Sequence, residues 1–173
     1  MTGFWRFGVL ACLVFAAALA APYCLRAHAA DAEQGESGLP VPRFVSLRAD
    51  EVNLRSGPGV RYPVEWVYQR KLMPVEVVEE FETWRKIRDW QGTEGWVNKA
   101  MLSWRRSVLV FGEIRTLRRE PAGESPAVAR AEPGVIARLL KCNGNWCKVE
   151  AGGYEGWLAR ADFWGVRVDE RIE

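Results

Sequence analysis

The sequence predicts an all-β protein made of two tandem copies of one small, five-stranded, partly open barrel. From Phe44 onward, short β-branched and aromatic runs alternate with Gly, Pro and Asn, as strands and turns do. No stretch keeps a 3.6-residue apolar period long enough for a helix of several turns. The pattern of the first half of this region also returns in the second half. A hydrophobic fraction of 49% excludes a disordered chain.

The N-terminal residues 1–29 have the features of a secretory signal peptide. Arg6 precedes a long uncharged apolar run, and Ala27-His28-Ala29 matches a small-x-small cleavage signature. We expect cleavage after Ala29, with cleavage after Ala20 as the alternative. Because the apolar run approaches the length that spans a bilayer, an uncleaved membrane anchor is a further alternative. A cleaved signal peptide predicts a periplasmic or secreted protein.

Removal of this leader changes the charge and the histidine content. Arg6 and Arg26 leave, so the 24 Lys and Arg fall by two and equal the 22 Asp and Glu, which all follow residue 30. A neutral mature chain is not expected to bind nucleic acid or an anionic membrane. His28 is the single histidine, so the mature chain can build neither a Ser-His-Asp triad nor a Cys-His pair. Carboxylate acid–base chemistry remains open to the many Asp and Glu, but no long loop offers a deep cleft for it. We therefore expect no catalytic residues, no cofactor and no metal.

A polar segment over 30–43 follows the leader. It contains Gly and two Pro, and it predicts a flexible or polyproline-like lead-in.

The rest of the chain repeats itself at about 62 residues. Asn53-Leu54-Arg55 aligns with Thr116-Leu117-Arg118, and Glu94-Gly95-Trp96 aligns with Glu155-Gly156-Trp157. Unit one therefore covers 44–104 and unit two covers 105–173. The short connection between the units predicts that they pack against each other.

Each unit is expected to hold five strands, because about sixty residues is close to the lower limit for one core. A sheet of that size manages its edges by curling into a partly open barrel. The strands are expected at 44–48, 63–68, 73–80, 84–90 and 94–98 in unit one, and at 107–111, 126–130, 135–141, 146–150 and 154–158 in unit two.

The segment Val52-Asn53-Leu54-Arg55-Ser56-Gly57-Pro58-Gly59, followed by Tyr62-Pro63 and Gly95-Trp96-Val97, resembles the bacterial SH3-like domain family. The resemblance covers nearly all of the mature chain. The segment over 81–90 is similar to an exported, two-copy branch of the family, whose function is largely unassigned. It implies an SH3-like barrel and non-catalytic binding to cell-wall peptides or envelope proteins. Unit two departs from the motif, since Arg119-Glu120-Pro121 replaces Ser-Gly-Pro, which argues against a ligand site shared by both units.

Cys142 and Cys147 predict a disulfide. A two-residue turn at Gly144-Asn145 would place them directly opposite each other, within bridging distance, and an exported chain permits oxidation. A redox-active pair is the alternative, although the spacing is not C-x-x-C. A metal site would need further soft ligands that the mature chain lacks. At the repeat offset these positions fall on Glu80 and Arg85, which predicts an exposed cross-strand ion pair in unit one.

The aromatic residues are the main functional candidates, because Trp and Tyr are frequent anchors for peptides. The alternative is that they fill the core and the interface between units. Asn53 and Arg55 would contact ligand or, alternatively, satisfy the carbonyls of the adjacent loop. The candidate ligand-binding residues are Asn53, Arg55, Tyr62, Trp66, Tyr68, Trp84, Trp90 and Trp96.

These features together predict a non-catalytic extracytoplasmic binding protein. Its expected ligand is a cell-wall peptide, such as one in peptidoglycan, or an envelope protein. A structural assembly factor that bridges envelope proteins is the alternative. A membrane-anchored sensor domain is a third possibility if the leader is retained.

Overall fold

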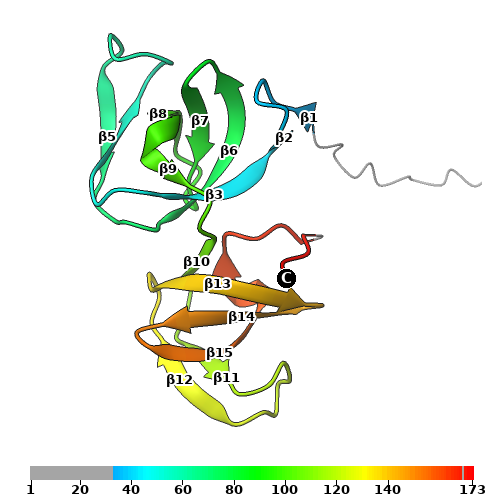
Figure 1. Cartoon of the computed structure of the whole chain (residues 1–173). Coiled ribbons are helices and arrows are strands. Elements are labelled where there is room, and N and C mark those ends of the chain that lie inside the picture. The colour runs from blue at the N-terminus through cyan, green and yellow to red at the C-terminus, as the bar shows by residue number, and fades with distance from the viewer. Residues whose placement is uncertain (1–32, 169) are drawn as a thin grey trace, which may run out of the picture. The chain divides into compact units, whose positions relative to one another are not determined.

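Two antiparallel β-sheets of seven strands each follow one another along the chain (Figure 1). The computed structural model describes residues 33–168 and 170–173. The signal peptide predicted at 1–29, with its cleavage positions, lies outside the described residues. Residues Ala32–Glu173 form one compact unit.

The first barrel comprises the strands β3 to β9, in the sheet order β5-β4-β8-β7-β6-β3-β9. Its elements are β3 (Arg43–Leu47), β4 (Val52–Arg55), β5 (Val64–Tyr68), β6 (Pro74–Phe81), β7 (Trp84–Arg88), β8 (Glu94–Asn98), the 3-10 helix η1 (Lys99–Met101) and β9 (Leu102–Ser103).

The second barrel comprises β10 to β16 and repeats that arrangement as β12-β11-β15-β14-β13-β10-β16. Its elements are β10 (Ser107–Val110), β11 (Arg115–Arg118), β12 (Ala127–Ala131), β13 (Ile136–Asn143), β14 (Trp146–Ala151), β15 (Tyr154–Ala159), the 3-10 helix η2 (Arg160–Asp162) and β16 (Phe163–Trp164). Within the described residues, neither 3-10 helix is long or apolar enough to cross a membrane.

The all-β tandem fold is confirmed, but each sheet holds seven strands where five were expected. The strands that sequence reasoning missed are β4 and β9, with their equivalents β11 and β16. The strand β4 alternates buried and exposed residues but is only four residues long, so its pattern merges with the turn that follows. The strands β9 and β16 have two residues each, too few to show any period.

The internal repeat extends to the irregularities of the sheets. The pairing of β4 with β5 shifts register between Leu54 and Arg55, and that of β11 with β12 shifts between Leu117 and Arg118. Both long hairpins, β6–β7 and β13–β14, also carry a register shift. Bulges bend a strand and increase its twist, so their recurrence gives both sheets the same curvature.

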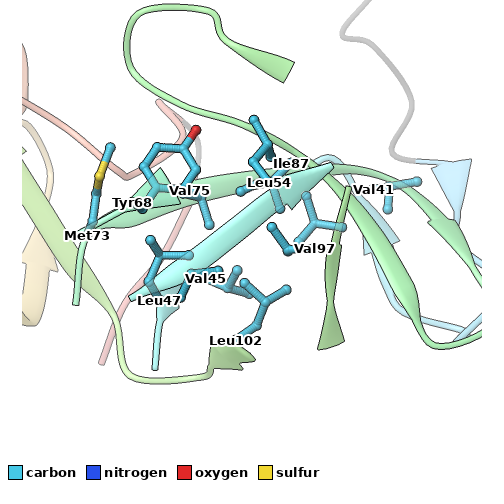
Figure 2. Packing of buried hydrophobic residues seen from close by; sticks show 12 residues of the cluster. Val41, Val45, Leu47, Leu54, Tyr68, Met73, Val75, Ile87, Val97 and Leu102 are labelled. Atoms are coloured by element: carbon cyan, nitrogen blue, oxygen red, sulfur yellow. The ribbon is translucent and has the colours of Figure 1, made fainter. Parts of the chain in front are cut away.

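The core of each barrel is a cluster of aliphatic side chains from the inner sheet face. Figure 2 shows the first cluster, which includes Leu54, Val75, Ile87 and Val97, all buried. The glycine of each Gly-Trp motif permits β4 and β8, or β11 and β15, to approach closely. A Cβ on Gly95 would lie 2.6 Å from Cγ of Leu54, and one on Gly156 would lie 2.8 Å from Cβ of Leu117.

The lead-in, for which the sequence predicts a flexible or polyproline-like segment over 30–43, contains a short β-hairpin from Glu33 onward. Strands β1 (Glu33–Gln34) and β2 (Pro40–Val41) pair as a hairpin. Val41 joins the apolar core of the first barrel. The sequence gives no sign of this anchorage, because Val41 stands between two prolines in a short segment with no strand pattern.

A buried carboxylate, Glu80 of β6, fastens the lead-in hairpin to the first barrel. Ser37 donates to it twice, from the backbone amide at 2.6 Å and from the hydroxyl at 2.8 Å. Arg43 lies 2.6 Å and Arg85 3.0 Å from Oε1 of Glu80, whose side chain has 0% exposure. The predicted pair of Glu80 with Arg85 is therefore present, but it is buried rather than exposed, because the lead-in covers it.

The same contacts set the protonation of Glu80. Burial opposes its ionisation and would raise the pKa, but the hydrogen bonds from Ser37 and Arg43 and the charge of Arg43 outweigh burial. The pKa of Glu80 is consequently held below its usual range, and the carboxylate is charged at neutral pH.

The predicted disulfide is confirmed. Cys142 and Cys147 face each other across the β13–β14 hairpin, with a Cα–Cα distance of 4.0 Å. The turn occupies Gly144 and Asn145, as expected, and Gly144 adopts a positive φ of 54°. This bridge lies at the position that corresponds to Glu80 and Arg85 in the first barrel.

The two barrels contact each other, as the short connection predicts. The hydroxyl of Ser107 donates to the carbonyl of Leu72 at 2.5 Å. The rings of Phe44 and Trp164 meet edge to face with 4.8 Å between centroids. Ile136 of the second barrel packs against the core cluster of the first.

Candidate functional site: an aromatic groove

Two exposed tryptophans of the first barrel line one groove of about 310 Å³. Trp66 comes from β5 and is 57% exposed, whereas Trp90 comes from the loop after β7 and is 45% exposed. Large apolar side chains exposed together are typical of binding surfaces rather than of scattered surface residues. The groove also includes Leu109 and Ile136 from the second barrel, so both barrels contribute to its wall.

Strand β5 presents Trp66 because it is the outermost strand of its sheet. Its only strand partner among the described residues is β4, and its first four residues are all exposed. Val64 and Val67 are therefore exposed on the same strand. An edge strand leaves backbone N–H and C=O groups available to a further strand.

The floor of the groove is a buried polar pair that positions the second tryptophan. The hydroxyl of Tyr68 donates to Oδ2 of Asp89 at 3.0 Å, and both residues are buried. The other oxygen of Asp89 accepts from the amides of Gln91 and Thr93, both at 2.9 Å. Asp89 thereby closes the loop that carries Trp90.

The hydroxyl of Tyr68 stays protonated near neutral pH. Burial, together with the charge of Asp89 and the hydrogen bond to it, raises the pKa of Tyr68 far above its usual value. The phenol thus remains a donor to Asp89.

The remaining predicted ligand residues lie outside the groove lining. Arg55 donates to the carbonyls of Val60 at 3.2 Å and Tyr62 at 2.7 Å. These bonds match the alternative prediction that Arg55 satisfies the carbonyls of the adjacent loop. The ring of Tyr62 covers Gly57, where a Cβ would lie 2.6 Å from Cδ1 of the ring. Asn53 is exposed on β4 and pairs in register with Val67 of β5.

Trp84 and Trp96 also lie elsewhere. Trp84 is buried at the start of β7, next to the hairpin turn. Trp96 of β8 is partly buried and pairs in register with Arg55 and Lys86. Of the predicted aromatic set, the structure therefore brings Trp66, Tyr68 and Trp90 together.

Sequence reasoning missed several residues of the groove. Leu109 and Ile136 belong to runs that resemble ordinary core strands of the second barrel. Met73 and Val67 likewise carry no signal of surface exposure. Only the contact between barrels reveals that these side chains border the groove.

The second barrel has a corresponding hollow, which is lined by Tyr154 but lacks equivalents of Trp66, Tyr68 and Trp90. A groove of about 240 Å³ is lined by residues that include Ala129, Ala131, Ala151 and Gly152. At the repeat offsets of 63 and 62, these four replace Trp66, Tyr68, Asp89 and Trp90 respectively. The aromatic constellation is therefore specific to the first barrel, in keeping with the expectation that the units do not share one ligand site.

Comparison with known proteins gives the family. The bacterial SH3 domain matches residues 48–103 and again residues 112–165. The chain belongs to the bacterial SH3 domain family. The first match falls in the first barrel and the second match falls in the second barrel. The tandem resemblance inferred from the sequence is therefore confirmed. The chain is thus a tandem of binding domains.

No curated protein matches this bacterial SH3 protein. Among solved structures, it is similar to NlpC2 from Trichomonas vaginalis, with 11% identity, a TM-score of 0.34, and coverage of 72% of this chain and 48% of that one. It is also similar to NlpC1 from the same organism, with 12% identity, a TM-score of 0.35, and coverage of 80% and 51%. The chain spans about half the length of these two proteins.

The described residues contain no group of three or more His, Cys, Asp or Glu side chains that could hold a metal ion.

Proposed function

We propose that this bacterial SH3 protein is an exported, non-catalytic binding protein of the cell envelope. It would recognise a peptide segment, from the cell wall or from an envelope protein, in the aromatic groove of the first barrel. The observation that carries the proposal is that Trp66 and Trp90, from different elements, are both exposed in one groove. Exposed aromatic side chains that become buried on binding contribute most of the affinity in many peptide interfaces.

The free edge of β5 supports a peptide as the ligand. An extended segment could pair with β5 while its side chains pack against the two tryptophans. The absence of histidine from residues 30–173 supports a role in binding without catalysis. The apolar run and cleavage signature of residues 1–29 support export.

Co-sedimentation with purified sacculi and capture from an envelope extract would test this proposal. The informative variant is Trp66→Ala with Trp90→Ala, because both side chains are exposed and their loss leaves the core intact. The matched control is Tyr154→Ala, since Tyr154 is 58% exposed and lines the equivalent hollow of the second barrel.

Wild type and control are expected to bind sacculi or to capture one discrete protein, and the double variant is expected to lose that ligand. Sedimentation with sacculi would identify the wall as the ligand. Recovery of a protein alone would identify an envelope partner. Equal binding by the double variant and wild type would overturn the proposal.

A further inference from the structure

Positive charge is concentrated in a cleft of about 240 Å³ between the lead-in hairpin and the first barrel. We call this hollow the basic cleft. Four cations line it, Arg43, Arg48, Arg85 and Lys99, and no carboxylate is among its described lining residues. Residues 30–173 have no formal net charge, but the described lining of this cleft carries only positive charges.

Two of these cations are neutralised only in part. Arg43 and Arg85 share the single carboxylate of Glu80. Arg48 and Lys99 are exposed and form no ion pair within the described part of the chain. The cleft therefore holds an excess of positive charge that no acidic side chain of its own lining balances.

The basic lining extends beyond this cleft. A neighbouring hollow shares Arg48 and Ser103 with it and adds Lys71 and Arg105. No carboxylate lines this second hollow either, within the described residues. The adjoining hollows give the surface room for more than one anionic group of an extended ligand.

One wall of the basic cleft is apolar. Val45 and Leu102 line it, together with Trp104, which is 65% exposed. The Arg43 guanidinium lies 5.7 Å from the centroid of the Trp104 ring. This cation–π contact holds Arg43 beside the exposed ring of Trp104.

We propose that the basic cleft binds an acidic peptide segment that also carries apolar side chains. Arginine matches the two oxygens of a carboxylate, and the charge of the cleft complements an acidic chain. The apolar wall favours a peptide over an anionic polymer such as polyphosphate, which has no apolar group to bury. Strand β9, whose residues Leu102 and Ser103 line the cleft, is the outermost strand at that end of its sheet.

The basic cleft and the aromatic groove share no lining residue. The inference therefore stands independently of the proposed function and adds a second binding site. The two sites can also be disabled separately by substitution.

Fluorescence anisotropy with a labelled, alternating Glu-Leu octapeptide would test the second site. The variant Arg48→Glu with Lys99→Glu is expected to weaken binding about tenfold or more at low salt, because two attractive charges become repulsive. The control Arg119→Glu with Arg130→Glu makes the same change in net charge on exposed positions of the second barrel. It should bind within about twofold of wild type, as should Trp66→Ala with Trp90→Ala.

Two further probes separate a peptide site from a general anion site. A Glu-Ser octapeptide of equal charge and a polyphosphate of equal charge are both expected to bind several-fold more weakly than the Glu-Leu peptide. The variant Trp104→Ala should abolish the advantage of Leu over Ser. Equal loss of binding in the two charge-reversed variants, unchanged binding in the Arg48 and Lys99 variant, or equal affinity for polyphosphate would overturn the proposal.

Discussion

Glu80 and Arg85 occupy, in the first barrel, the two hairpin positions that a disulfide joins in the second. In both hairpins the pair lies directly opposite in register, next to an aromatic residue at the turn. The ionic version also holds a second segment, because Glu80 accepts from Ser37 and from Arg43. The two barrels are thus stabilised at equivalent positions by different chemistry.

Replacing Glu80 is expected to destabilise the first barrel strongly. The variant Glu80→Gln leaves Arg43 and Arg85 without their shared carboxylate, and breaking a buried ion pair costs about 3 kcal/mol. Urea unfolding of the chain from residue 30 onward would measure the loss. The control Glu79→Gln removes an exposed carboxylate and should change the free energy of unfolding by less than about 0.5 kcal/mol. Equal unfolding midpoints for the two variants would contradict a stabilising role of the Glu80 carboxylate.

The same carboxylate should make the first barrel sensitive to acid. The pKa of Glu80 is lower in the folded state than its ordinary value of 4.5, so the folded state holds fewer protons there. Its stabilisation is therefore complete above about pH 4.5 and is lost as the pH falls through the lowered folded value. Thermal unfolding between about pH 6 and about pH 3 should show a steeper fall for wild type than for Glu80→Gln. Parallel curves would show that Glu80 is not linked to folding.

Reduction is expected to weaken the second barrel instead. Opening the Cys142–Cys147 bridge should cost about 2 kcal/mol, because the bridge closes a short loop in the unfolded chain. Urea unfolding with and without dithiothreitol would measure this difference. The variant Cys142→Ala with Cys147→Ala should not respond to dithiothreitol. A response by that variant would assign the effect to something other than the bridge.

Adding one methyl group at Gly156 is expected to destabilise the second barrel by about 1–3 kcal/mol. The new Cβ would lie 2.8 Å from Cβ of Leu117 and 3.2 Å from the carbonyl oxygen of Arg118, so β11 and β15 would have to separate. The control is Gly123→Ala, where a Cβ meets nothing within 4 Å. Chemical denaturation would compare the two. A smaller loss at Gly156 than at Gly123 would contradict the close approach.

The sequence was sufficient for features that depend on local pattern. The hairpin with Cys142 and Cys147 follows from a two-residue turn and residue spacing, and the Gly-Trp motifs follow from the repeat. The burial of Glu80 could not be predicted, because its partners Ser37 and Arg43 lie 43 and 37 residues away. A glutamate in a strand gives no sign of such distant contacts.

The candidate site was likewise predictable only in part from the sequence. Aromatic richness indicated Trp66 and Trp90, but it equally indicated Trp84, which the core takes up. Which aromatic side chains remain exposed depends on which strand ends the sheet and on where the second barrel packs. Net charge similarly carries no information on segregation, so a neutral total could not reveal Arg48 and Lys99 beside one cleft.

The anchored hairpin bears on how the first SH3 domain can be dissected from the chain. The match to the family begins at residue 48, after β1, β2 and β3. A fragment cut there would lack Val45 and Leu47 from the core and Arg43 from the buried ion pair. It would also expose the edge of β6 that β3 covers, and an exposed strand edge promotes aggregation. A fragment that is to fold alone should therefore begin no later than Glu33.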